Sequence, residues 1–183
     1  PEQGTFTTFP AGPAPLTFIV VGDTHQNARI LGLMASEFEK HAPNLIIHTG
    51  DIVDDGNGAP PRVWREGFFK PLGAVLRHVP VYVVRGNHDG TPDRLPLFFS
   101  FPGGELNYSF DFGDVHFVGI DEHVTSPKAA LAWCERDLAA STSRWKIAFF
   151  HRPIFNVGDH GYASKRETYL PLFQRYGVDM TRS

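Results

Sequence analysis

Four short polar clusters hold the side chains that could do chemistry in this chain. They contain, in chain order, Asp23 and His25, then Asp51 and Asp54, then Asn87, His88 and Asp89, and last His151. Carboxylates, imidazoles and an amide oxygen together form a mixed oxygen and nitrogen ligand set that suits Zn, Fe or Mn. A carboxylate such as that of Asp51 could bridge two ions with its two oxygens. The residue types therefore predict a metal site.

Each cluster directly follows an apolar run that predicts a buried strand. These runs span residues 16–21, 45–48, 81–84 and 145–150. In open α/β sheets the carboxyl ends of the strands line the ligand crevice, so we expect the four clusters to converge there. The flanking glycines Gly22, Gly50 and Gly86 let the backbone turn sharply and approach a ligand closely.

The remaining pattern alternates helices with strands. Apolar residues at helical spacing predict a helix around 31–38, and further helices are expected over 62–77, from Ser126-Pro127 through 141, and from the capping box at 164–167 to Gly177. Strands are expected at 5–9, before the linker 10–15, and in a hairpin formed by 106–112 and 115–120. This order predicts an α/β domain, and the hairpin favours a mixed sheet.

Each cluster also has a purely structural interpretation. Asp23, Asp51 and Asp54 could cap a helix or a loop, Asn87 and Asp89 could form a turn, and His151 could be an ordinary strand-end residue. Taken singly, these roles are the more common ones for such residues. Chance would have to repeat the arrangement at four successive strand ends, however, so the clusters taken together favour the metal site.

Composition excludes several classes of function. The chain has 183 residues, 42% of them hydrophobic, which is enough for one domain with a full core. A net charge of −3 without a run of basic residues gives no reason to expect nucleic acid or an anionic membrane as a partner. Cys134 is the only cysteine, so an internal disulfide and a zinc–thiolate site are not expected. No apolar run approaches the roughly 18 residues of a membrane span.

The motifs GDTH, GDIVDD, GNHD and HRP, in this order, resemble the signature of the calcineurin-like metallophosphoesterases. That signature runs D-x-H, G-D-x-x-D, G-N-H-D/E and then a single histidine. Within the superfamily, the stretches 6–23 and 158–179 are most similar to the purple acid phosphatase branch. The resemblance implies an α/β fold of two mixed β-sheets packed as a sandwich and flanked by helices. Residues 1–15 would end a preceding fibronectin-like domain or linker, and residues 16–183 would form the catalytic domain.

The resemblance also implies roles for the clustered residues. Asp23 and His25 would hold a first metal ion, Asn87 and His151 a second, and Asp51 would bridge the two ions, which would be Fe, Zn or Mn. His88 would lie near the leaving group of a phosphate ester, as a general acid or a charge stabiliser. Asp54 and Asp89 would orient the ligands. Weaker candidates for contacting the substrate phosphate, with a surface or packing role as the alternative, are Arg152, His160 and Tyr162.

Two departures from the family pattern modify these expectations. Purple acid phosphatases carry an iron-binding tyrosine where this chain has Asp54, so the protein should not be purple and its first metal need not be ferric. The sequence ends at YGVDMTRS without the final G-H-x-H motif, and we expect none of the other histidines to replace it. We therefore expect a truncated and weakly active phosphomonoesterase or phosphodiesterase. The alternatives are a metal-binding fragment or interaction module without turnover and, third, a plain structural domain. The oligomeric state stays open, and the family points to a secreted or periplasmic location.

Overall fold

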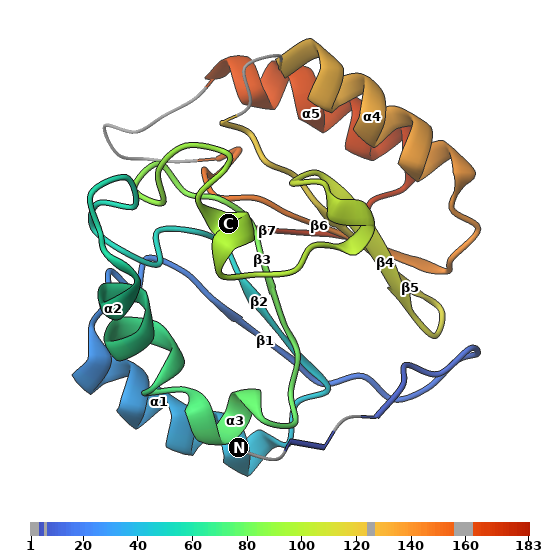
Figure 1. The fold of residues 1–183 in the computed structure, drawn as a ribbon. Coiled ribbons are helices and arrows are strands. Elements are labelled where there is room, and N and C mark those ends of the chain that lie inside the picture. Colours follow the sequence, from blue (N-terminus) through green and yellow to red (C-terminus); the bar gives the residue numbers. More distant parts are fainter. Residues whose placement is uncertain (1–3, 6, 124–126, 156–162) are drawn as a thin grey trace.

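The computed structural model describes residues 4–5, 7–123, 127–155 and 163–183 and contains two β-sheets packed face to face (Figure 1). The first sheet has three parallel strands, β1 (Phe18–Val21), β2 (Leu45–His48) and β3 (Val81–Val83). The second has the order β4 (Tyr108–Phe112), β5 (Val115–Gly119), β6 (Trp145–Phe149) and β7 (Met180–Arg182). It is mixed, because β4 and β5 are antiparallel while β5, β6 and β7 run parallel. The predicted α/β architecture is confirmed.

Helices cover the outer face of each sheet (Figure 1). The first sheet carries α1 (Ala28–His41) and the short helices α2 (Pro61–Trp64) and α3 (Gly73–Leu76), and the second carries α4 (Pro127–Ala140) and α5 (Ala163–Tyr176). Two single 3₁₀ turns, Leu95–Leu97 and Pro102–Gly104, lie between β3 and β4. Among the described helices, none is long and apolar enough to cross a membrane.

The strands alternate their side chains between separate cores, as the pleat requires. In β2, Ile46 faces the helices of the first sheet, whereas Leu45 and Ile47 face the second sheet. In β5, Phe117 joins the core between the sheets and Val118 faces α4 and α5. Because each such side chain stabilises the fold by about 1.5–3 kcal/mol when fully buried, this packing holds the strand ends in place.

The sequence also sets the limits of the long helices. The Asn27 side chain accepts a hydrogen bond from Ile30 N at 3.2 Å and so caps the start of α1. The buried face of α1 contains Leu31, Ala35 and Phe38, which fall at the predicted helical spacing. Gly177, with a φ of 66°, follows the last residue of α5, as predicted for a glycine that ends a helix.

One predicted strand does not form, and one predicted helix is interrupted. No strand forms over 5–9 in its described residues, and Phe9 instead packs on Phe112 with a ring-centroid distance of 5.0 Å. The predicted helix 62–77 is interrupted by a π-helical segment, Arg65–Phe69, in which Lys70 N donates to Arg65 O at 2.8 Å. The π-helical segment packs closely against Gln26. A Cβ on Gly67 would lie only 2.5 Å from the Cβ of Gln26.

A histidine between two carboxylates joins the second sheet to α4. It belongs to none of the four polar clusters. His116 on β5 lies 2.7 Å from Asp111 Oδ1 through Nδ1 and 2.9 Å from Asp137 Oδ2 through Nε2. A carboxylate accepts hydrogen bonds, so both ring nitrogens must carry a proton for both bonds to form. Burial lowers the pKa of His116, but the bonds to Asp137 and Asp111 outweigh burial and raise the pKa above its usual 6.5.

We expect His116→Gln to destabilise the protein more at pH 6 than at pH 9. A histidine whose pKa is raised by folding contributes stability that is fully present below the unfolded pKa and is lost as the pH rises through the folded pKa. Urea unfolding at both pH values measures the difference, with the exposed His41→Gln as control. An equal loss of unfolding free energy at the two pH values would contradict the charged state of His116.

Candidate metal centre

The carboxyl ends of four parallel strands bring the predicted site residues to one edge of the two sheets. Asp23 and His25 follow β1, Asp51 follows β2, the stretch 87–89 follows β3, and His151 follows β6. Parallel pairing places the ends of β1, β2 and β3 side by side. The predicted convergence of the four clusters is therefore present in the structure.

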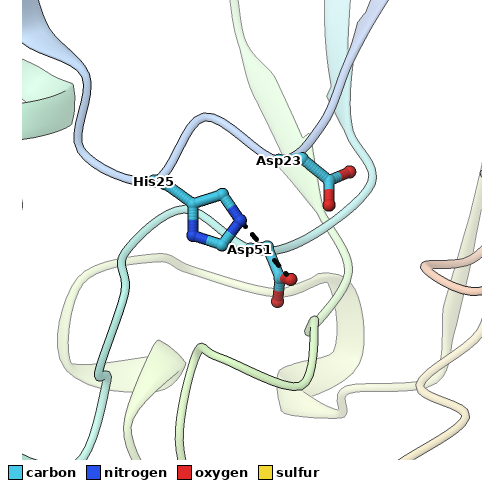
Figure 2. A group of neighbouring side chains, drawn as sticks. All are labelled: Asp23, His25 and Asp51. Carbon is cyan, nitrogen blue, oxygen red and sulfur yellow. Dashed lines mark ion pairs between the residues drawn. The ribbon is translucent and has the colours of Figure 1, made fainter.

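A first group of ligand atoms comes from Asp23, His25 and Asp51, where one atom of each residue lies within 4.8 Å of the others. His25 Nε2 lies 3.8 Å from Asp51 Oδ2. Figure 2 shows the His25 imidazole beside the Asp51 carboxylate, with Asp23 on the same loop as His25. Two carboxylates and one imidazole at this separation can hold a divalent or trivalent cation.

The loops that carry this group adopt an unusual backbone. Asp23, His25 and Asp51 have φ values of 51°, 43° and 55°, in the left-handed region that residues other than glycine rarely adopt. The two loops hold each other through hydrogen bonds from Asp23 N to Gly50 O at 2.9 Å and from His25 N to Asp51 O at 3.0 Å. Such conformations cost on the order of 1–3 kcal/mol each and cluster at functional sites.

A second group lies on the other side of Asp51. His151 Nε2 lies 3.1 Å from Asn87 Oδ1 and 3.4 Å from Asp51 Oδ2. The opposite ring nitrogen, His151 Nδ1, lies 2.9 Å from the carbonyl oxygen of Thr49. A carbonyl only accepts, so Nδ1 carries a proton. In the neutral ring Nε2 then has a lone pair beside two further acceptors, whereas a protonated Nε2 would donate to them.

This second group suits a cation. Without one, three atoms that can each accept a hydrogen bond, His151 Nε2, Asn87 Oδ1 and Asp51 Oδ2, would lie together with no donor between them. Burial lowers the pKa of His151, but the hydrogen bond and charge of Asp51 outweigh burial and raise the pKa. Burial likewise raises the pKa of Asp51, and hydrogen bonds from His151 and the His88 backbone outweigh it and leave the pKa lowered. In the absence of a metal ion, the Asp51 carboxylate stabilises a second proton on the His151 ring, at Nε2. A metal ion satisfies the same three acceptors directly.

Asp89 fixes the loops beneath both groups. Its carboxylate is fully buried and accepts hydrogen bonds from four backbone N–H groups, those of Asp51 and Gly86 at 2.8 Å, Ile52 at 2.7 Å and Val53 at 3.4 Å. Burial raises the pKa of Asp89, and these N–H bonds oppose the rise. The carboxylate thus ties the loop after β2 to the loop after β3.

His88 and Asp54 lie at the exposed side of the site. His88 Nδ1 lies 2.8 Å from the carbonyl oxygen of Asp54, which leaves Nε2 available. The His88 ring meets the His25 ring edge-on, with centroids 5.0 Å apart. The Asp54 carboxylate lies 2.9 Å from His25 Nδ1 and accepts a hydrogen bond from Gln26 Nε2 at 2.7 Å. The orienting role of Asp54 stays a prediction.

Glycine is required at two of the turns. A Cβ on Gly86 would lie 2.1 Å from Asp51 Oδ1, and a Cβ on Gly50 would lie 2.6 Å from Gly86 N. Gly50 also has a φ of 101°. The close approach of the loops after β2 and β3 therefore depends on the absence of side chains at both positions.

Of the weaker substrate candidates, the structure describes Arg152. Arg152 follows His151, and its backbone N–H donates to Glu122 Oε1 at 3.0 Å. Contact between the Arg152 side chain and a substrate stays a prediction. His160 and Tyr162 lie outside the described residues.

Two histidines that the sequence analysis did not place in the site lie next to it. His48, fully buried at the end of β2, accepts a hydrogen bond from Gly50 N at 3.2 Å through Nδ1, and its Nε2 lies 3.1 Å from Thr24 Oγ1. Burial lowers the pKa of His48 to about 3, so the ring is neutral and braces both loops. His123, in the loop after β5, lies with its ring centroid 5.7 Å from that of His151. Their only sequence signal is a histidine at the end of an apolar run.

Comparison with known proteins identifies relatives of this chain. The model of the calcineurin-like phosphoesterase family matches residues 16–181. A probable glycerophosphodiester phosphodiesterase GpdQ of Arcobacter nitrofigilis is 27% identical over 130 residues, which cover 65% of this chain and 45% of that protein. Purple acid phosphatase 23 of Arabidopsis thaliana is 30% identical over 134 residues, covering 62% of this chain and 29% of that protein. The chain thus spans less than half the length of these relatives.

Solved structures share the fold. The purple acid phosphatase PPD1 from yellow lupin (Lupinus luteus) seeds superposes with a TM-score of 0.72 at 18% identity, over 96% of this chain and 39% of that one. A dimetal phosphatase from Danio rerio gives a TM-score of 0.68 at 16% identity, over 87% of this chain and 77% of that one. At these identities the likeness concerns the architecture of two sheets flanked by helices.

Proposed function

Because the chain belongs to the calcineurin-like phosphoesterase family, we propose that it hydrolyses phosphate esters at a centre of two metal ions. The observation that carries the proposal is the position of Asp51. One oxygen of this carboxylate, Oδ2, lies 3.8 Å from His25 Nε2 and 3.4 Å from His151 Nε2. A single carboxylate between two groups of ligands is the arrangement that a shared ligand requires.

The chain's own residues divide into two sets of ligands. Asp23 and His25 would hold the first ion with Asp51, and Asn87 and His151 would hold the second with the same carboxylate. Asp89 and Asp54 would keep the ligand loops and the His25 ring in place, in keeping with their hydrogen bonds and short contacts. Residues that orient metal ligands in this way typically affect metal affinity by about 10–100-fold.

When bound, such ions grip the phosphate and lower the pKa of a coordinated water toward neutrality, which supplies the nucleophile. The protein adds a proton-transfer group. His88 Nδ1 is engaged by the Asp54 carbonyl at 2.8 Å, so Nε2 is the atom that can give a proton to the leaving oxygen or stabilise its charge. The backbone N–H of His88 donates to Asp51 Oδ1 at 2.8 Å. This bond fixes the position of His88 relative to the shared ligand Asp51.

The donor set favours Fe, Zn or Mn but does not select among them. Asp54 occupies the position of the iron-binding tyrosine of purple acid phosphatases, and its carboxylate faces His25 Nδ1 at 2.9 Å. A ferric first ion is therefore not required by this chain. A relative described as a phosphodiesterase and one described as a phosphatase support phosphate esters as the substrate class, monoesters or diesters. The assignment of residues 1–15 to a linker and the secreted or periplasmic location stay predictions.

Metal removal tests this function directly. We expect the protein, stripped with a chelator and reloaded with Mn²⁺ or Zn²⁺, to bind two ions per chain by elemental analysis. Because metal that binds only the folded state stabilises it, by about 2.7 kcal/mol at a hundred times Kd, the melting temperature should rise on reloading. Hydrolysis of nitrophenyl phosphate and bis(nitrophenyl) phosphate should appear with the metal. Two bound ions without hydrolysis would favour a binding module, and no bound metal would contradict the proposal.

A further inference from the structure

A buried glutamate next to His151 has no part in the ligand sets above. Glu122 lies in the loop after β5, and its side chain is only 3% exposed. The strands β5 and β6 run parallel, with Gly119 paired to Phe149, so the loops that follow them leave the same edge of the sheet. Glu122 therefore lies beside the loop that carries His151.

The Glu122 carboxylate ties three segments together. Its Oε1 accepts a hydrogen bond from the backbone N–H of Arg152 at 3.0 Å. It also forms an ion pair with Lys165 on α5 and lies 3.9 Å from His123 Nε2. The loop after β5, the loop after β6 and the start of α5 thus meet at one carboxylate.

The same loop is held firmly on its other side. Asp121 forms an ion pair with Arg85 at 3.0 Å, with both side chains 5% exposed or less. The Asp121 N–H donates to Asn107 Oδ1 at 2.9 Å. Because Arg85 directly precedes the GNHD stretch, Glu122 is anchored to the segment that also carries Asn87. Because these contacts fix the loop that carries Glu122, Glu122 can in turn fix the position of the loop that carries His151.

We propose that Glu122 is a positioning residue for His151 and thereby for the second metal ion, an inference that rests on the proposed function. The His151 ring is fixed at one end by the contact of Nδ1 with Thr49 O at 2.9 Å. Its backbone is fixed at the other end by the peptide group shared with Arg152, which Glu122 holds. With both ends fixed, Nε2 stays within 3.4 Å of Asp51 Oδ2.

Removing the Glu122 carboxylate should release one of these two constraints. The Arg152 N–H would lose its acceptor, and the Lys165 ammonium would lose an ion-pair partner, in a region with little water. Losing these contacts in a buried region is costly, so the loop after β6 should shift. His151 would move with it, while the ligands of the first ion lie on the loops after β1 and β2 and should remain in place.

The test measures metal affinity by competition with a chelating indicator dye. We expect Glu122→Ala to weaken binding of one ion by about 10–100-fold and to leave the other near its wild-type affinity. Glu122→Gln should lose less, because its amide oxygen can still accept from the Arg152 N–H. Asp137→Ala is the matched control, since it also removes a carboxylate from an ion pair with a histidine but lies on α4 against β5. It should lower the melting temperature without changing either affinity.

A double-mutant cycle separates positioning from general stabilisation. If Glu122 acts through His151, adding Glu122→Ala to His151→Ala should cost little further metal affinity. Additive losses, or wild-type affinity for both ions in Glu122→Ala, would overturn the inference. Failure of the wild-type protein to bind two ions would instead reject the proposed function. If Glu122→Ala does not fold, the cycle is run with Glu122→Met, which fills a similar volume but offers no oxygen to the Arg152 N–H, and the same two outcomes decide it.

Discussion

Replacing Asp51 with alanine is expected to empty both metal positions and to abolish measurable phosphoesterase activity. The carboxylate is 4% exposed, and its Oδ2 faces the histidine of each ligand group. Loss of a residue that only orients a ligand typically lowers metal affinity by about 10–100-fold, so loss of a shared ligand should cost each ion at least that factor. Elemental analysis of the purified variant and a metal titration measure the result.

A carboxylate in the same loop provides the control. Asp55 is exposed, and its Oδ1 accepts a hydrogen bond from Gly58 N at 3.0 Å, so Asp55→Ala should retain both ions. Asp51→Asn keeps the shape of the side chain but removes the charge, and it should still weaken both positions. Loss of a single ion from Asp51→Ala would assign the carboxylate to one position only. Two ions bound at wild-type affinity would reject the shared-ligand assignment.

The meeting of the four polar clusters at one edge of the sheets could be predicted because it depends on short-range patterns. Apolar runs that end in Gly-Asp or Gly-Asn identify both the strands and the points where they stop. Parallel pairing then brings Asp23, Asp51 and Asn87 to one edge of the first sheet, whatever the details of the loops. The family resemblance and these patterns independently led to the same residues.

The predicted helix over 62–77 failed because its shape is set by a tertiary contact. Apolar spacing indicates a helical stretch, and the stretch is indeed helical in parts. Gly67 must approach Gln26 closely, however, and the π-helical hydrogen bond from Lys70 N to Arg65 O accommodates that approach. Hydrophobic periodicity carries no information about a neighbour from a distant part of the chain.

The roles of His48 and Glu122 could not be predicted for a related reason. Neither residue lies at a motif spacing, and each acts through backbone groups that the fold brings to it. His48 reaches Thr24 and Gly50, and Glu122 reaches the N–H that follows His151. Supporting residues of this kind are visible only once the loops have been placed in space.

Replacing His88 with alanine is expected to leave both ions bound but to lower kcat by about 10²–10⁴-fold, the usual contribution of a positioned acid or base. The ring belongs to neither of the two proposed ligand sets, and its Nδ1 is engaged by the Asp54 carbonyl. The backbone N–H that supports Asp51 is retained in the variant. Metal content should therefore separate this substitution from Asp51→Ala. The exposed His41→Ala, at the end of α1, is the control and should change neither quantity.

The dependence on leaving group decides which role His88 plays. If its Nε2 gives a proton to the departing oxygen, the loss in His88→Ala should be largest for alkyl phosphates, whose alkoxide leaves poorly unless it is protonated. Nitrophenolate leaves readily without a proton, so nitrophenyl phosphate should be affected much less. An equal loss for both substrates would indicate that the ring stabilises charge on the phosphoryl group instead. Full activity on both substrates, with both ions bound, would remove His88 from the reaction altogether.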